Sequence, residues 1–217
     1  MGTDVTAAQQ HEAAAAAAMD AAGALAPDVA PASDRPLRAD ARRNRERILA
    51  AARECFAEDA QATQMDDIAR RAGVGVGTVY RHFPTKTALV GELLRAKFGH
   101  HAERAREWYE RADGWAAFEG FVRESVSEME ADASQQRMLW VADEDAFEYA
   151  TDAREALAGE VARLIERAQS AGEMRADFTV DDVPTVMCAI GSVMSAPTVK
   201  RTERLVEFLL AAIGPQR

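Results

Sequence analysis

Apolar residues recur every three or four positions from Leu37 to the end of the chain, as on one face of an α-helix. We find no clear run of alternating apolar and polar residues, which is the pattern of a half-buried strand. The sequence therefore predicts an all-α fold. The expected helices cover residues 39–58, 65–73, 76–83, 85–112, 115–132, 135–143, 150–170, 182–195 and 200–213.

Capping residues refine two of these helix starts. Pro184 is tolerated in a first turn, where its missing N–H does no harm, so Asp181 is the expected N-cap of helix 182–195. Thr63 and Asp66 have the spacing of a capping box and are expected to start the second helix. No glycine follows the first helix, so a left-handed residue at its end would cost about 1 kcal/mol.

Charge divides the chain into three segments, although the net charge is −10. Residues 1–36 hold an alanine run and three prolines but no apolar face, so we expect a disordered N-terminal extension. Residues 37–100 carry 12 Lys and Arg against 8 Asp and Glu, whereas residues 101–217 carry 13 against 23. This asymmetry favours a nucleic-acid partner for the first folded domain, 37–101, and an acidic second domain, 102–217.

The stretch "AGVGVGTVYRHF" at residues 72–83 has glycines at every second position: Gly73, Gly75 and Gly77. A loop that binds a nucleotide phosphate needs GxGxxG directly after a buried strand, or Gly-Lys-Ser/Thr. Here the spacing is GxGxG, and the charged, amphipathic "DDIARRA" precedes it. A nucleotide-binding enzyme is therefore the less favoured alternative, and a helix-turn-helix is the prediction.

A helix-turn-helix explains each apolar residue of this region. Ile68, Ala69 and Ala72 form a narrow stripe, and Gly73 lies where the turn favours a positive φ. Val79 and Phe83 return to the core at i, i+4 spacing. The side chains left outside suit insertion into a DNA major groove. They are Val76, Gly77, Thr78, Tyr80, Arg81 and His82.

The stretch "DDIARRAGVGVGTVYRHFPTKTALV" closely resembles the N-terminal domain of TetR-type transcriptional regulators. The resemblance covers about residues 41–101 and implies a helix-turn-helix running from Gln64 to Phe83 that reads double-stranded operator DNA. Its implied phosphate or base contacts are Thr78, Tyr80, His82 and Lys86, its variable base-reading positions are Val76, Gly77 and Arg81, and its basic arm is Arg42, Arg43 and Arg45. Each of these polar side chains also has a structural alternative in packing, capping or plain solvation.

The second half resembles the C-terminal domain of a subset of such regulators more weakly, through "LIERAQSAGEMRADFTVDDVPTVMCAIGSV". The resemblance implies an all-helical dimerisation domain that often surrounds a small-molecule pocket. The last helix is apolar nearly all round, and Gly191 and Ser195 permit close helix crossing, so we expect a homodimer through the last two helices. Candidates for an apolar effector pocket, which are also typical of an ordinary core, are Trp108, Phe118, Met138, Trp140 and Met187.

Other chemistry is not expected. Cys55 and Cys188 are far apart and fit reduced thiols in a cytoplasmic protein. His100 and His101 have no third ligand at metal spacing and are expected on a solvated face. We expect no catalytic residue, no metal, no cofactor and no membrane span. The favoured function is a ligand-responsive, homodimeric repressor on a palindromic operator, with a ligand-independent regulator or an activator left open.

Overall fold

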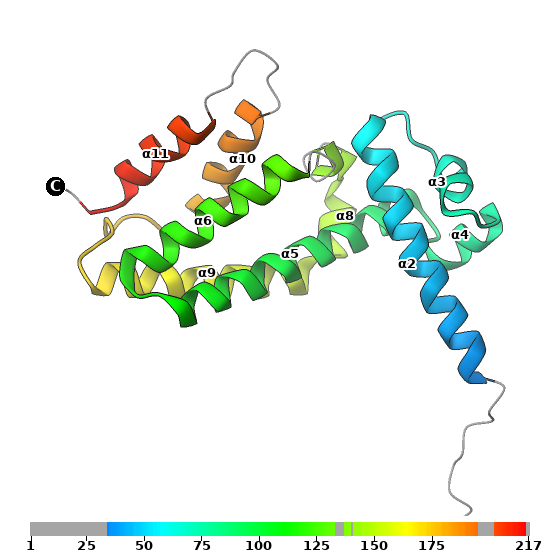
Figure 1. The fold of residues 1–217 in the computed structure, drawn as a ribbon, viewed down its shortest axis with the longest axis horizontal. Helices are drawn as coiled ribbons and strands as arrows, with labels where there is room; N and C mark the ends of the chain where they lie inside the picture. The colour runs from blue at the N-terminus through cyan, green and yellow to red at the C-terminus, as the bar shows by residue number, and fades with distance from the viewer. Residues whose placement is uncertain (1–33, 133–136, 140, 195–201, 216–217) are drawn as a thin grey trace, which may run out of the picture. The chain divides into compact units, whose positions relative to one another are not determined.

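The computed structural model describes residues 34–132, 137–139, 141–194 and 202–215, and all regular secondary structure in these ranges is helical. The chain divides into two compact units, Met1–Ala41 and Arg42–Arg217, and of the first only the opening turns of one helix are described. The helices are α2 (Asp34–Asp59), α3 (Met65–Ala72), α4 (Val76–His82), α5 (Lys86–Arg111), α6 (Gly114–Ala131), α8 (Glu144–Glu148), α9 (Thr151–Ser170), α10 (Asp182–Met194) and α11 (Thr202–Ile213) (Figure 1).

The second unit contains two hydrophobic clusters. The first joins α2, α3, α4 and the beginning of α5, and its fully buried side chains include Ile48, Phe56, Ile68, Val79 and Leu94. The second joins α6, α9, α10 and α11 to the later part of α5 around Phe118, Leu164 and Ile190. Full burial of each such side chain stabilises the folded state by about 1.5–3 kcal/mol.

α5 contributes to both clusters. Leu89, Leu93 and Leu94 belong to the first, and Ala105 belongs to the second. At 26 residues the helix is about 39 Å long. α8 lies directly on the first half of α5, where a Cβ built on Gly91 would lie 2.5 Å from the Cβ of Tyr149. The close approach therefore requires glycine at this position.

Most helices agree with the sequence prediction to within one or two residues at each end. α2 is the exception, since it begins at Asp34 rather than near residue 39. The expected helix 135–143 falls partly outside the described residues, although Arg137–Leu139 and Val141 are helical. The short α8 was not expected; it begins where Asp143 accepts a hydrogen bond from the Ala146 N–H at 2.9 Å.

The local capping predictions needed two corrections. The predicted capping box of Thr63 and Asp66 is wrong. The buried Thr63 hydroxyl donates to the Cys55 carbonyl, and it is the Asp67 carboxylate that accepts from the Gln64 N–H, at 3.0 Å. α2 ends without a left-handed residue, because the Asp59 side chain accepts from the Gln61 and Ala62 N–H groups. α10 starts directly after Asp181 as expected.

The second correction concerns what closes the first turn of α10. The Asp182 carboxylate accepts from the Thr179 N–H and hydroxyl, at 2.8 and 2.9 Å. A tight turn, in which the Val183 N–H donates to the Val180 carbonyl, precedes Pro184. Thr179 therefore takes part in the start of α10. Because the tight turn precedes Pro184, the proline ring does not meet the carbonyl that an ideal α-helical turn would place there.

Candidate DNA-binding surface and effector cavity

The turn between α3 and α4 is built on Gly73, whose φ is +64°. The Val74 N–H donates to the Ala69 carbonyl and the Gly73 N–H donates to the Arg70 carbonyl, which closes the end of α3. A Cβ at Gly73 would also lie 2.9 Å from the Arg47 guanidinium. Glycine is therefore favoured here by its backbone conformation, since the exposed Arg47 side chain can move aside.

α4 packs through Val79, which is fully buried, and presents its other face to solvent. Val76 is 42% exposed and Tyr80 is 47% exposed, both high for apolar or aromatic side chains. A Cβ at Gly75 or Gly77 would contact nothing within 4 Å. The exposed face of α4 therefore carries few side-chain atoms at its start, so the backbone of its first turn can approach another molecule closely.

The polar residues of this face are only lightly engaged. The Arg81 guanidinium donates to the Thr78 hydroxyl at 3.2 Å, and both lie on the outer side of α4. His82 is half-buried, and its ring lies 6.4 Å from that of Phe83. Weak internal contacts of this kind can be exchanged for contacts with phosphates or base edges at little cost.

Two other predicted DNA contacts are engaged inside the fold. The Lys86 ammonium donates to the carbonyls of Thr63 and Ala60, at 2.7 and 3.1 Å, and burial lowers its pKa. Arg45 pairs with Glu92 at 2.6 Å and lies over the Phe83 ring. In this structure Lys86 holds the loop between α2 and α3, and Arg45 packs on Phe83 at the end of α4.

Arg42 and Arg43 lie on the exposed side of α2, as expected for a basic arm. Arg42 forms only a solvent-exposed contact of 3.8 Å with Glu46. Exposed pairs of this kind contribute little to stability, so Arg42 can leave it for a phosphate.

Family comparisons agree with this geometry. A model described as bacterial regulatory proteins of the tetR family matches residues 48–93, and one described as the SbtR-like transcriptional regulator C-terminal domain matches residues 113–213. The crystal structure of a TetR regulatory protein from Mycobacterium vanbaalenii is 34% identical, with a TM-score of 0.56, over 82% of this chain and 99% of that one. The chain belongs to the TetR family.

Other relatives match less of the chain or at lower identity. An HTH-type transcriptional regulator of Staphylococcus aureus is 40% identical over 67 residues, which span 30% of this chain and 35% of that relative. A TetR regulator of Streptomyces coelicolor is 26% identical over 80% of this chain and 99% of that one, with a TM-score of 0.56. FadR of Bacillus subtilis, solved with stearoyl-CoA, is 18% identical over 77% of this chain and 98% of that one, and its TM-score of 0.61 shows a shared fold.

This TetR-family chain is therefore a DNA-binding transcriptional regulator, and the family's members are regulators rather than enzymes. The nucleotide-binding alternative is accordingly wrong: Gly73 forms a helix-ending turn and Gly77 lies within α4. No helix in the described part of the chain is both long and apolar enough to cross a membrane. Among the same residues, no three His, Cys, Asp or Glu side chains gather as a metal site requires.

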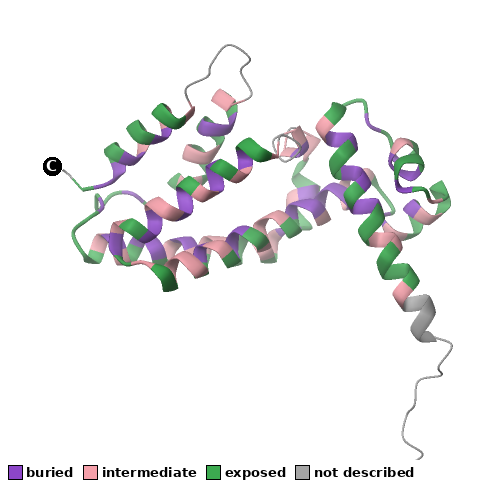
Figure 2. Ribbon diagram, viewed as in Figure 1, coloured by how far each residue is buried: buried purple, intermediate pink, exposed green. Residues whose placement is uncertain are grey.

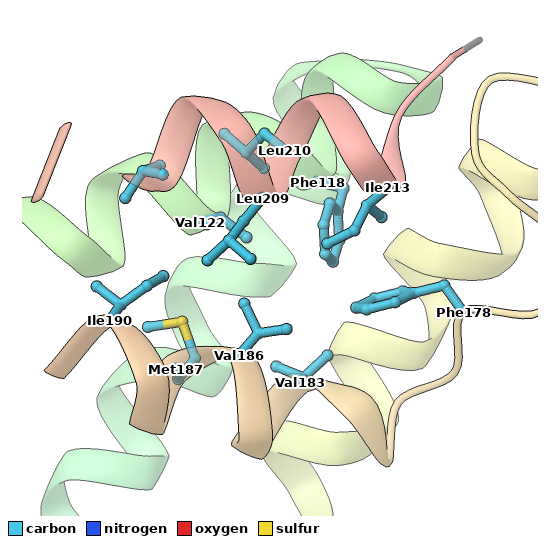
Figure 3. A pocket seen from close by; sticks show the side chains of 11 residues that line it. Phe118, Val122, Phe178, Val183, Val186, Met187, Ile190, Leu209, Leu210 and Ile213 are labelled. Atoms are coloured by element: carbon cyan, nitrogen blue, oxygen red, sulfur yellow. The ribbon is translucent and has the colours of Figure 1, made fainter. Parts of the chain in front are cut away.

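An apolar cavity lies between α6, α10 and α11, and Figure 3 shows side chains from these helices and Phe178 pointing into it. Phe118 and Met187 line it, together with Ile190 and Leu209. Its free volume is about 10 Å³, which is the space of about one water molecule. The cavity is closed in this structure, and an occupant would have to part α10 and α11.

Two further predicted pocket residues, Trp108 and Met138, do not line this cavity. Trp108 packs against Gly120 and donates its indole N–H to Glu124 at 2.5 Å. Met138 is buried in the first hydrophobic cluster. Trp140 lies outside the described residues.

The position of His101 differs from the sequence prediction. It was expected on a solvated face, but it is 8% exposed and only His100 is at the surface, where it bonds Glu128 at 3.0 Å. A signal was present, since His101 follows Leu94 by seven residues and therefore shares its face of α5. Burial, together with the charges of Lys97 and His100, lowers the pKa of His101 to about 4, and Glu128 and Glu124 oppose the shift.

Acid should therefore destabilise the protein through His101. Its folded pKa lies below the unfolded value, so the unfolded state binds more protons between about pH 6.5 and 4, and stability falls as the pH falls through that window. His101→Gln is expected to remove about 2 kcal/mol of the loss in unfolding free energy between pH 7 and 4.5. Urea unfolding at both pH values and one protein concentration measures this. An identical loss in both proteins would show that His101 is solvated.

Proposed function

We propose that this protein is a cytoplasmic, ligand-responsive repressor that binds a palindromic operator as a homodimer and is released by an apolar small molecule. The observation that carries the proposal is the exposed, side-chain-poor face of α4 next to basic residues of α2. In the proposed organisation residues 37–101 bind DNA and residues 102–217 dimerise and bind the effector, after an N-terminal extension of residues 1–36.

In the proposed complex α4 enters the major groove. Val76, Gly77 and Arg81 read base edges, and Thr78, Tyr80 and His82 contact phosphates or bases. Arg42 and Arg43 approach the backbone from α2. Arg45 and Lys86 act through their contacts with Phe83 and the α2–α3 loop, and Lys86 retains one ammonium hydrogen for a phosphate.

The proposed dimer interface is the outer face of α10 and α11. Phe208 is 61% exposed, the highest value among the large hydrophobic residues described. The neighbouring α10 face carries small exposed side chains, namely Thr185, Cys188, Ala189 and Ser192. Figure 2 shows exposed and buried stretches alternating along α11, and the buried residues of α10 are Ile190 and Gly191, so each helix has one face for its own chain and one for a partner. Gly191, expected at the crossing, is buried, and Ser195 lies outside the described residues.

The proposed effector site is the closed apolar cavity around Phe118 and Met187. Its walls include α10 and α11, which are also the proposed dimer helices. An apolar ligand that opens the cavity would alter the contact between subunits and thus the spacing of the two α4 helices. Complete switching requires about 5.5 kcal/mol of preference for the released state.

The proposal is tested with fluorescently labelled DNA from the region flanking the protein's own gene. We expect the purified dimer to bind at 50 mM salt and to lose affinity about 1000-fold by 200 mM, because phosphate neutralisation releases counterions. Fluorescence anisotropy measures both values. Failure to bind any flanking DNA at 50 mM salt, or an affinity independent of salt, would contradict the proposed operator mode.

A further inference from the structure

A second, polar cavity lies between α2, α5 and the end of α6, away from the apolar cavity. Its volume is about 180 Å³. Phe56 and Met138 supply an apolar wall, and four basic or potentially basic side chains line the rest: Arg53, Lys97, His100 and His101. The two cavities share no lining residue.

Arg53 and Lys97 lack close partners, whereas His100 bonds Glu128. In the described part of the chain, neither Arg53 nor Lys97 has a hydrogen bond or an ion pair within 4.0 Å. Burial lowers the pKa of Lys97, and the carboxylate of Asp132, which also lines the cavity, opposes that shift. Arg53 is exposed, but Lys97 is partly buried. A partly buried charge without a close counter-ion is costly, and an incoming anion would offset that cost.

His101 supplies an independent sign of a ligand site. It is 8% exposed, lines the cavity, and has no hydrogen-bond partner for its buried Nδ1 among the described residues. The closest acidic atom is the Glu128 Oε2, at 3.8 Å, and that carboxylate is already bonded to His100 at 3.0 Å. Buried polar atoms are nearly always satisfied, so an unpaired one on a side chain that lines a cavity indicates a missing partner.

We infer that this cavity binds a small organic carboxylate, whose anionic end lies among Arg53, Lys97 and His101 and whose apolar body lies against Phe56 and Met138. The planar carboxylate matches the guanidinium fork of Arg53 and can accept from the imidazole of His101. The apolar wall favours an organic acid over inorganic phosphate. The size suits a single-ring acid, because cavities for drug-sized ligands begin at about 300 Å³.

Calorimetry on the full-length protein without DNA tests the inference with sodium benzoate as the probe. Benzamide, its neutral counterpart, and inorganic phosphate are titrated in parallel. We expect benzoate to bind at least about tenfold more tightly than either, since only benzoate has both the charge and the apolar body. Undetectable benzoate binding at millimolar concentration, or equal binding of benzamide or phosphate, would overturn the inference.

Matched variants locate the site. Lys97→Gln and Arg53→Gln should each weaken benzoate binding about tenfold. Arg95 is an exposed cation on α5 that does not line the cavity, so Arg95→Gln should leave benzoate binding unchanged. Met187→Ala, in the apolar cavity, should also leave it unchanged. Loss of binding in Met187→Ala, or full binding in both Lys97→Gln and Arg53→Gln, would overturn the site. Circular dichroism shows that each variant is folded, and operator affinity measured without benzoate reports separately on the proposed function.

Discussion

Gly77→Asp is expected to weaken operator binding at least about 100-fold, since placing like charges together at an interface costs several kcal/mol. The substituted carboxylate would lie on the face of α4 proposed to approach DNA phosphates. Gly77 has no positive φ, and a Cβ there contacts nothing within 4 Å. An acidic residue in the first turn of a helix also interacts favourably with its N-terminus. The fold should therefore tolerate the change, and anisotropy together with thermal unfolding measures both effects.

Gly159→Asp is the matched control for this variant. Gly159 is an exposed helical glycine of α9 whose Cβ would likewise contact nothing within 4 Å. The two variants have the same net charge, so a general electrostatic effect would lower their DNA affinity equally. Wild-type affinity in Gly77→Asp, or equal weakening in both, would show that α4 is not the DNA-reading surface.

Phe208→Glu is expected to raise the dissociation constant of the dimer about 1000-fold. Its side chain is exposed in the single chain, where the Arg204 guanidinium lies 5.2 Å from its ring, so the monomer fold loses little. In the proposed dimer the same position is covered, and burial of an unpaired carboxylate costs several kcal/mol. Analytical ultracentrifugation measures the dissociation constant.

Tyr80→Glu provides the reciprocal control, because Tyr80 is also a largely exposed aromatic residue. It should remain dimeric and lose operator binding, whereas Phe208→Glu should dissociate and lose operator binding only because the two half-sites are no longer bound together. A dimer that persists in Phe208→Glu would place the subunit interface elsewhere.

The fold could be predicted from sequence because its local signals agree. The helical spacing of Ile48, Ala52 and Phe56 defines the face of α2 that enters the first core, and the glycine-rich turn before Val76 defines α4. Phe83 follows Val79 by four residues and returns to the same core. These features depend on neighbours within one or two helical turns, which a sequence displays directly.

The site was harder to predict, since it depends on contacts between distant segments. Lys86 reaches carbonyls 23 and 26 residues away, which no local pattern reveals. Phe118 and Met187 meet in one cavity, while Met138 packs in the other cluster, because the crossing of the helices decides which apolar residues face one another. His101 was misassigned for the same reason: it lies on α5 against α6, where Glu128 is 3.8 Å from its Nδ1.

Close packing of α8 on α5 at Gly91 leaves no slack between these elements. The Tyr149 Cβ and the Ala146 carbonyl occupy the space that even a methyl group would need. A shift of α8 therefore has to carry α5 with it, a few residues after Thr85, whose hydroxyl caps the start of that helix beside α4. At Gly91, therefore, α5 and α8 are expected to move as one unit, because no side chain separates them.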